Sequence, residues 1–279
     1  MIILQPTQTR YVEIHHLQWH AVWHLQFPES IGCRQGWVMD FPAIYPQWQR
    51  AEDGGYAYHW QSDAQYIAEQ EGHQARNAAF GQEKKQFIAG VHLYAALTPA
   101  ETAVYLHLEL TNNSQQRLTG LVCEGGCFQA KSAAFTAEDE VSRTYISTAD
   151  GMQALSTLTR TQLERCVYHT DLQAYELPPD NEGEWFWGRS QDRVVAPVMV
   201  GMVAVDGGKT AVIGYENALS GSANADEHHC MHSRPHFGDL QPGDTVIRKG
   251  MIAFDSDIES AAKRVREYVS IRENENNRR

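Results

Sequence analysis

The feature that most constrains the fold is an alternation of apolar and other side chains with a period of two residues. It is clearest at 104–110, Val-Tyr-Leu-His-Leu-Glu-Leu, which runs into the turn-rich Thr-Asn-Asn-Ser at 111–114. Such alternation places successive side chains on opposite faces of a β-strand. The same reasoning predicts further strands at 56–60, 87–96, 118–128, 143–147, 195–205, 210–215 and 245–254. We therefore predict a chain built mainly of antiparallel β-sheet.

Two local signals refine this prediction. Asp206-Gly-Gly-Lys209 separates two predicted strands, and glycine accepts the positive φ of a tight turn, so those strands should pair as a hairpin. One helix is predicted, at 256–272, because Ser256 and Glu259 form a capping-box pattern. Apolar residues then recur at helical spacing, at Ile258, Ala261, Ala262, Val265, Tyr268 and Val269. We expect this helix to cover the body of the fold.

The length of 279 residues fits one large β domain, since all-β chains extend well past 200 residues as one unit. With 42% hydrophobic and 21% charged residues, the chain can bury a sizeable core. We expect a single domain over 1–279. Within it, 1–90 would supply N-terminal strands and loops, 91–254 the main sandwich, and 256–272 the C-terminal helix.

The net charge and the absence of several known motifs narrow the classes of partner that the chain is expected to bind. The 23 basic and 35 acidic residues give a net charge of −12, which repels polyphosphate backbones and anionic lipid surfaces. The sequence also lacks a dinucleotide-binding glycine motif, a Walker loop, a nucleophile elbow and a kinase signature. We expect a small-molecule partner and neither nucleic acid nor membrane, and the sequence leaves the oligomeric state open.

Cysteine usage and the N-terminus indicate a compartment. The five cysteines, an odd number, lie in a chain long enough to fold without disulfides, which is typical of reduced thiols in the cytoplasm. The first residues, Met-Ile-Ile-Leu-Gln-Pro, have neither a basic lead nor the long apolar run of a signal peptide or spanning helix. The prediction is a cytoplasmic protein.

The densest cluster of chemically active residues begins at His228, where four of the 13 histidines fall within nine positions. In an extended chain His228, Cys230 and His232 share one face. They make a partial Zn²⁺ or Fe²⁺ site that a further ligand such as Glu124 or Asp239 would complete. The same geometry suits a metal-free acid/base pair of His228 and His232. It also suits a structural loop in which Cys230 is a small core residue.

A second candidate is Glu124, in the run Cys123-Glu-Gly-Gly-Cys127. The glycine pair predicts a bulge where another backbone approaches closely, which would aim Glu124 into a cleft as a catalytic carboxylate. The Cys-x3-Cys spacing differs from the Cys-x2-Cys of common zinc ribbons and is a weak metal signal. We therefore pair Glu124, or alternatively Asp239, with the histidines as the complementary catalytic carboxylate.

Cationic and aromatic residues supply the substrate-binding candidates, which are Arg143, Tyr145, Trp185, Trp187 and Arg189. Arginine with a nearby tyrosine can grip sugar hydroxyls or a carboxylate, although an ion pair between Arg143 and Glu140 explains those residues equally well. Tryptophan suits the apolar face of a sugar ring, yet paired tryptophans also occur in cores. Arg143 or Arg189 would fix an anionic group of the substrate.

The C-terminal motif carries a resemblance to a known group. His228-x-Cys-x-His-Ser-x-Pro-x-x-Gly-Asp-Leu-x-Pro-Gly243, with Gly250-x-Ile-x-Phe254, resembles a set of bacterial proteins similar to the galactose-mutarotase-like β-supersandwich group. The segments Cys127–Gln129 and Arg143–Ile146 add to the likeness, which spans about 91–268; before residue 91 it is thin and rests on Phe27–Gly32. It implies a large antiparallel β-supersandwich and carbohydrate or uronate chemistry.

No mutarotase site transfers residue by residue. Mutarotases proper carry an Asn-His-x-Tyr-Phe-type motif, and Thr111-Asn-Asn-Ser114 lacks its histidine. The predicted function is proton transfer on a sugar or sugar acid, either as an epimerase or isomerase or as a lyase that performs β-elimination. No cofactor is certain, with Zn²⁺ or Fe²⁺ assistance left open. The alternative is a non-catalytic carbohydrate-binding protein in which Trp60, Trp185 and Trp187 stack on sugar rings.

Overall fold

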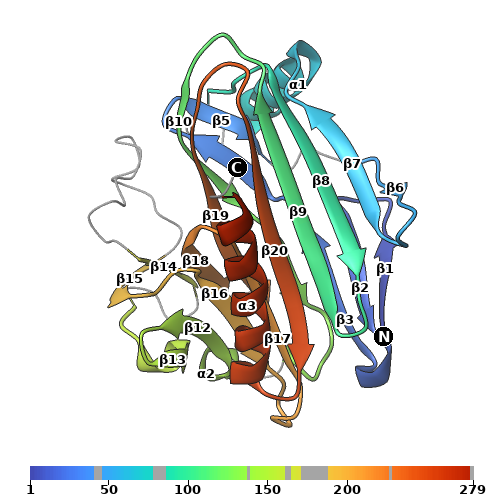
Figure 1. Ribbon diagram of the computed structural model, residues 1–279, viewed down its shortest axis with the longest axis vertical. Coiled ribbons are helices and arrows are strands. Elements are labelled where there is room, and N and C mark those ends of the chain that lie inside the picture. The colour runs from blue at the N-terminus through green and yellow to red at the C-terminus, as the bar shows by residue number, and fades with distance from the viewer. Residues whose placement is uncertain are drawn as a thin grey trace.

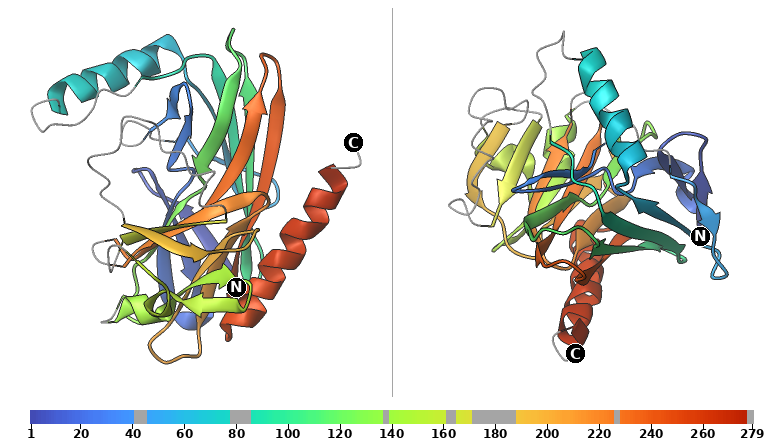
Figure 2. Two further views of the ribbon diagram at one scale, coloured as in Figure 1. Left: turned by 90° about the vertical axis from the view of Figure 1, so that its left-hand side faces the viewer. Right: turned by 90° about the horizontal axis from the view of Figure 1, so that it is seen from above.

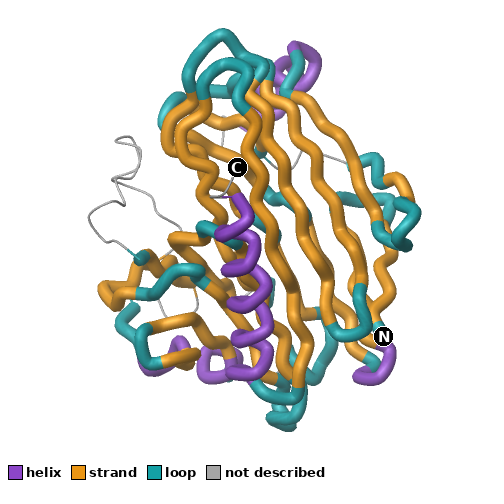
Figure 3. The backbone as a smooth tube through the Cα atoms, viewed as in Figure 1, coloured by secondary structure: helices purple, strands orange, loops and turns teal. Residues whose placement is uncertain are grey.

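The computed structural model describes residues 1–40, 46–77, 86–136, 139–160, 165–170, 188–225 and 228–276. Within these residues the strands form one sheet of 11 and one of 9, which confirms the predicted all-β class (Figures 1 and 3). None of the described helices is both long and apolar enough to cross a membrane. In chain order the elements are β1 (Ile2–Pro6), β2 (Tyr11–His16), β3 (Ala21–Gln26), β4 (Ser30–Cys33), β5 (Gly36–Met39), β6 (Gln49–Arg50), β7 (Tyr56–Gln61), α1 (Ala64–Asn77), β8 (Val91–Pro99), β9 (Ala103–Asn112), β10 (Leu118–Glu124), β11 (Cys127–Ala130), α2 (Glu140–Arg143), β12 (Thr144–Thr148), β13 (Gly151–Ala154), β14 (Arg165–His169), β15 (Gly188–Arg193), β16 (Met199–Val203), β17 (Thr210–Tyr215), β18 (Ala218–Asn224), β19 (Cys230–Leu240), β20 (Thr245–Asp255) and α3 (Ile258–Asn276).

The 11-stranded sheet is organised around β19. Its main path runs β1-β2-β3-β11-β19-β10-β4-β5, while β18 pairs with the other edge of β19 and β14 with β18. Strand β15 continues this side by pairing in parallel with β14. Segments from the N-terminal, middle and C-terminal parts of the chain therefore meet along one long strand.

The nine-stranded sheet has the order β13-β12-β16-β17-β20-β9-β8-β7-β6. Strands β16 and β17 pair antiparallel with Val203 opposite Thr210, which confirms the predicted hairpin. The region 1–90 contributes to both sheets, because β6 and β7 lie in this one and β1 to β5 in the other.

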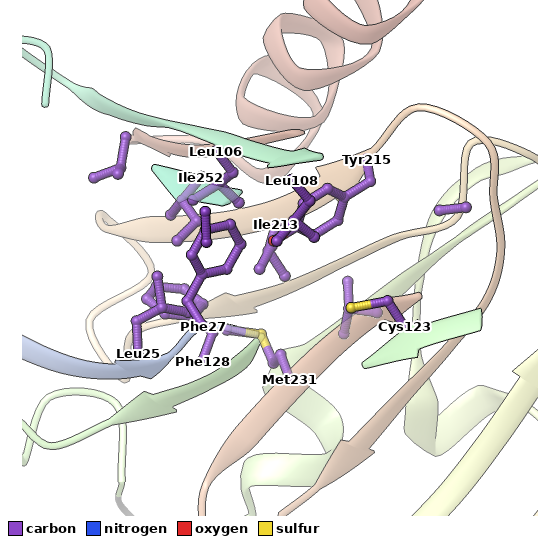
Figure 4. Close-up of a cluster of buried hydrophobic side chains, with 14 of the residues drawn as sticks. Leu25, Phe27, Leu106, Leu108, Cys123, Phe128, Ile213, Tyr215, Met231 and Ile252 are labelled. Atoms are coloured by element: carbon purple, nitrogen blue, oxygen red, sulfur yellow. The ribbon is translucent and has the colours of Figure 1, made fainter. Parts of the chain in front are cut away.

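A continuous apolar core fills the space between the sheets. Leu25, Phe128 and Met231 come from the 11-stranded sheet and meet Leu106 and Ile252 of the nine-stranded sheet (Figure 4). Each is fully or almost fully buried. The period-two pattern therefore directs one face of each sheet into a shared core.

Helix α3 lies along the outer side of the nine-stranded sheet, with the 11-stranded sheet on the opposite side of the molecule (Figure 2). The predicted helix is confirmed, but its predicted cap is wrong. Asp257, not Ser256, caps the first turn, because its Oδ2 accepts the Ser260 N–H at 2.8 Å. Glu259 instead accepts the N–H of Met152 on β13 at 2.8 Å, tying the helix to the sheet.

Helix α1 was not predicted from the sequence. Its first turn is capped by Asp63, whose Oδ1 accepts the N–H of Tyr66 at 2.8 Å. Tyr66 is buried and its ring meets Trp60 of β7 edge to face, with the ring centroids 4.8 Å apart. This packing places Trp60 against α1.

Candidate functional site

The two faces of β19 differ in character. Met231 points into the apolar core, so by strand alternation Cys230, His232 and Arg234 point to the outer side of the 11-stranded sheet. We call these three residues, together with Glu29 and Glu124, the polar cluster. All lie away from the nine-stranded sheet and form the densest group of chemically active side chains that the described residues bring together.

His232 lies between two carboxylates. Its Nδ1 is 3.2 Å from Oε2 of Glu29 and 3.4 Å from Oε2 of Glu124. The imidazole is only 4% exposed, whereas the Glu29 and Glu124 side chains are 16% and 24% exposed, so both glutamates are more open to solvent than the ring. Burial alone disfavours the imidazolium, but Cys127 and Glu29 raise the pKa of His232 well above its ordinary value.

Arg234 makes the two carboxylates inequivalent. Its Nε is 2.6 Å from Oε1 of Glu124, and its Nη2 donates to Oγ of Ser222 at 3.0 Å. Burial acts to raise the pKa of Glu124, but the charges of Arg234 and His232 outweigh it and lower that pKa to about 2. Glu124 is therefore held as an anion.

The other ring nitrogen of His232 faces sulfur. Nε2 lies 3.1 Å from Sγ of Cys230. Sγ of Cys127 completes a buried group in which the two sulfurs and a nitrogen of His232 all lie within 4.8 Å of one another. Gln129 donates an N–H to Sγ of Cys127 at 3.0 Å. Two buried thiols and an imidazole are a donor set that a thiophilic metal ion prefers.

The glycine pair after Glu124 divides the predicted strand 118–128 into β10 and β11. A Cβ on Gly125 would lie 2.7 Å from the Tyr215 ring and 2.8 Å from the carbonyl oxygen of Ser233, so glycine is required there. The Tyr215 hydroxyl donates to the carbonyl of Gly125 at 2.6 Å. This close approach brings Glu124 and Cys127, from the two sides of the break, to the same histidine.

Two of the predicted catalytic residues lie elsewhere. His228 is exposed on the turn before β19. Asp239 lies near the far end of β19, seven positions from His232, which at the usual rise per strand residue is roughly 23 Å. There it accepts bonds from Arg117 at 2.6 Å and from the Gly120 N–H at 2.8 Å. In the polar cluster the second carboxylate is Glu29, in the place that the sequence analysis gave to Asp239.

The predicted substrate-binding residues are dispersed. Arg143 ends α2 and donates to the carbonyls of Phe135 at 3.2 Å and Val203 at 3.0 Å. Tyr145 packs into the apolar cluster beneath α3. Glu140, considered as the ion-pair partner of Arg143, is buried and contacts Nδ1 of His229, and burial raises its pKa to about 7.

Arg189 is the cationic candidate that shares the sheet with the cluster. It pairs in register with Val167, which pairs with Ser222, which in turn pairs with His232. Side chains in register lie on the same face, so Arg189 stands on the face of the polar cluster, three strands from His232. Trp185 and Trp187 fall outside the described residues.

Glu29, Arg234 and Cys127 were not among the predicted site residues. Arg234 carried a signal, since it continues the alternation of Cys230 and His232 along one strand. Glu29 carried none, because it reaches the cluster only through the pairing of β4 with β10, in which Ser30 lies opposite Glu124. Cys127 likewise depends on the pairing of β11 with β19.

Comparison with known proteins yields structural likenesses only. No family model and no curated protein sequence matches the chain. It is similar to a galactose mutarotase related enzyme from Lactobacillus acidophilus, with 6% identity, a TM-score of 0.46, and coverage of 93% of this chain and 99% of the other. A galactose mutarotase-like protein from Clostridium acetobutylicum has 8% identity and a TM-score of 0.46, and the match covers 91% of this chain and 92% of the other. A putative aldose 1-epimerase from Escherichia coli has 9% identity and a TM-score of 0.42, with coverage of 92% of this chain and 99% of the other. The resemblance stated from the sequence is to this same mutarotase-like group.

Proposed function

We propose that this chain is an enzyme that transfers a proton on a sugar or sugar acid bound against the polar cluster, with Glu29 as the catalytic residue. One observation carries the proposal: Nδ1 of His232 lies between two carboxylates, and Arg234 holds one of them, Glu124. Carboxylates in unlike environments can divide the roles of fixed anion and proton carrier. The choice of a carbohydrate substrate is supported by the resemblance of the C-terminal motif.

The roles follow from contacts and exposure. Glu124 is engaged with Arg234, so it serves as a fixed anion that faces Nδ1 of His232. Glu29 reaches solvent and contacts the same ring, which makes it the group that meets a substrate. His232 has one nitrogen on the carboxylates and the other on sulfur, so it is a positioning residue that donates an N–H to Glu29.

In the proposed reaction Glu29 removes the proton from the carbon beside the carbonyl or carboxyl group of the sugar. Return of a proton to that carbon from a solvent water on the opposite face gives an epimer, and the proton held by Glu29 passes to solvent. Loss of a substituent from the next carbon, with the electron pair forming a double bond, gives the elimination product instead. A positioned general base of this kind contributes about 10²–10⁴-fold to the rate.

The test uses galactose, glucose, galacturonate and glucuronate in D₂O, followed by NMR for deuterium incorporation at carbon, epimeric product and unsaturated product. We expect turnover of at least one sugar and a loss of about 10²–10⁴-fold in Glu29→Gln. The matched control is Glu109→Gln, because Glu109 lies on β9 of the other sheet, beside His107. Unchanged turnover in Glu29→Gln would refute the role of Glu29.

The same panel tests the alternative of a sugar-binding protein. That alternative needs an aromatic platform, and of its three tryptophans Trp60 packs against Tyr66, while Trp185 and Trp187 lie outside the described residues. Calorimetric binding of a panel sugar without any proton exchange at carbon, epimerisation or elimination would replace the enzyme proposal with this one.

A further inference from the structure

The thiol side of His232 has its own chemistry, separate from the carboxylate side. In the register of β11 with β19, Gln129 lies opposite Cys230 and Phe128 opposite Met231, so Cys127 follows opposite His232. Cys230 thus approaches the ring of His232 along β19, and Cys127 approaches the same ring from the neighbouring strand β11. Backbone pairing on both strands fixes this arrangement, which makes it preorganised rather than dependent on a loop.

Polar partners distinguish Cys127 and Cys230 from the other buried cysteines. Cys123 and Cys166 belong to the apolar core between the sheets, where cysteine acts as a small hydrophobic residue. Cys127 and Cys230 are equally buried, at 4% and 2% exposure, but their partners are the polar side chains of Gln129 and His232. Apolar packing therefore does not account for placing two thiols here.

From this geometry we infer that Cys127, Cys230 and Nε2 of His232 bind a zinc-class divalent metal ion. Zn–S bonds of about 2.3 Å and Zn–N bonds of about 2.0 Å in a tetrahedron place the ligand atoms roughly 3.5–3.8 Å apart. The group has comparable dimensions, since Sγ of Cys230 lies 3.1 Å from Nε2 and no two of the ligand atoms are more than 4.8 Å apart. A set of two cysteines and one histidine leaves a fourth position for water or substrate.

The carboxylates complete the site from outside. A metal-bound histidine usually donates its other N–H to a carboxylate, which fixes the ring and its tautomer. Nδ1 of His232 has two such acceptors, Glu29 at 3.2 Å and Glu124 at 3.4 Å. A carboxylate-histidine-metal arrangement therefore requires no movement of the ring.

The opposite side of the ring is the poorer metal site. Glu29, Glu124 and His232 also bring one ligand atom each within 4.8 Å of one another. However, the guanidinium of Arg234 lies 2.6 Å from Glu124, and its charge opposes a cation beside that carboxylate. The thiol side has the softer donors, which select zinc-class ions over magnesium or calcium.

The first measurement is the metal content of the protein purified under reducing conditions, by elemental mass spectrometry, followed by Co²⁺ titration of the metal-stripped full chain. We expect about one ion per chain, with the intense visible bands of tetrahedral cobalt and a thiolate-to-cobalt charge-transfer band. Absence of stoichiometric Co²⁺ binding, or a spectrum without the charge-transfer band, would overturn the inference. This result needs no variant, so it stands even if a substituted chain fails to fold.

Variants then assign the ligands. Cys127→Ser and Cys230→Ser should each weaken Co²⁺ binding at least tenfold and reduce the charge-transfer band. The controls Cys33→Ser and Cys166→Ala should bind as the parent does, because Cys33 is on β4 and Cys166 lies in the apolar core. Parent-like Co²⁺ binding in either ligand variant would overturn the assignment. So would a Cys127–Cys230 disulfide in the freshly purified protein whose reduction yields a chain that binds no cobalt.

The inference is independent of the proposed sugar chemistry, since metal binding is measured without substrate. Glu29→Gln leaves all three ligands in place and should still bind Co²⁺ with its charge-transfer band. Loss of turnover with retained cobalt in that variant separates the proton carrier from the metal site. Metal binding with no turnover of any sugar would leave the metal site standing and the proposed function refuted.

Discussion

The two sheets present very different outer faces. The nine-stranded sheet turns Met199, Val212 and Met251 outward, and α3 covers them with Ala261 and Val265 in a second apolar cluster. The 11-stranded sheet turns the polar cluster outward, where His232 and Arg234 are nonetheless buried. Helix α3 therefore covers apolar side chains on the outer face of the nine-stranded sheet. The outer face of the 11-stranded sheet carries charged side chains that are buried.

This difference separates structural from functional burial. Apolar burial under a helix stabilises the fold in proportion to the area removed from water. Burying an ion pair brings a desolvation penalty that its Coulomb attraction only partly offsets, and apolar replacements of such pairs are often neutral or stabilising. Burial on the nine-stranded sheet is thus explained by stability, whereas burial of charges on the 11-stranded sheet is not. The outer face of the 11-stranded sheet is therefore the better candidate for a functional site.

The largest stability effect should come from breaking the polar cluster. Arg234→Met leaves Glu124 without the guanidinium 2.6 Å away, and removal of one partner of a buried pair costs about 3–5 kcal/mol. Urea unfolding measures the loss. The double variant Glu124→Gln with Arg234→Met should recover most of it, since no uncompensated charge remains. If Arg234→Met alone is as stable as the parent, Glu124 and Arg234 do not form a buried ion pair in solution.

The next effect is a pH dependence at α2, where Glu140 contacts His229 on the turn before β19. Burial raises the pKa of Glu140 from 4.5 to about 7, with His229 and Arg143 acting in the opposite direction. The folded chain thus holds a proton that the unfolded chain releases, so the free energy of unfolding should fall as the pH rises from about 4.5 to 7. A shift of this size corresponds to roughly 3 kcal/mol.

Glu140→Gln should remove that slope and be more stable than the parent at pH 8. Glu101→Gln is the matched control, because Glu101 is exposed in the turn between β8 and β9. Chemical unfolding at pH 5, 6, 7 and 8 gives the comparison. Parallel profiles for Glu140→Gln and the parent would show that the buried carboxyl does not titrate in this range.

The sequence predicts the strands and the helix that bury apolar side chains far better than it predicts the polar cluster. Alternation identified strands such as β9, β17 and β20, and helical spacing identified α3, because both patterns are local consequences of one face being buried. The polar cluster is non-local: Glu29, Glu124 and His232 come from three segments that only strand pairing brings together. Local spacing instead favoured His228 and Asp239, neighbours of His232 in the chain but not in space.

Turn residues explain the remaining differences. The predicted strand 118–128 is divided at Gly125, whose missing side chain admits the ring of Tyr215. Helix α1 begins after a capping aspartate, Asp63, and is held to β7 by the packing of Tyr66 against Trp60. Local capping rules also selected Ser256 where the chain uses Asp257. In each case a tertiary contact decides among locally acceptable choices.

On the helix-covered face the corresponding disruption is overpacking. A Cβ on Gly214 would lie 2.7 Å from Cγ1 of Val265 and 2.8 Å from Cγ of Met199, so Gly214→Ala must displace α3 or Met199. We expect a loss of about 1–3 kcal/mol, measured by urea unfolding, without any change in Co²⁺ binding. Gly208→Ala is the control, since its Cβ would meet only Asp206 at 3.9 Å. A stability equal to that of the parent would mean that α3 is not packed closely on β17.

The smallest effect should come from the cap of α3, and it opposes Glu140 in sign. Backbone N–H groups, with that of Ser260 first, lower the pKa of Asp257, so its contribution is present above its unfolded pKa and is lost as the pH falls. Asp257→Ala should cost about 1 kcal/mol at pH 7 by thermal unfolding, and less as the pH approaches 3. Ser256→Ala should cost clearly less, because the Ser256 hydroxyl does not cap the first turn. A larger loss in Ser256→Ala than in Asp257→Ala would indicate that Ser256 caps the helix, as the sequence suggested. It would contradict the observed start of α3.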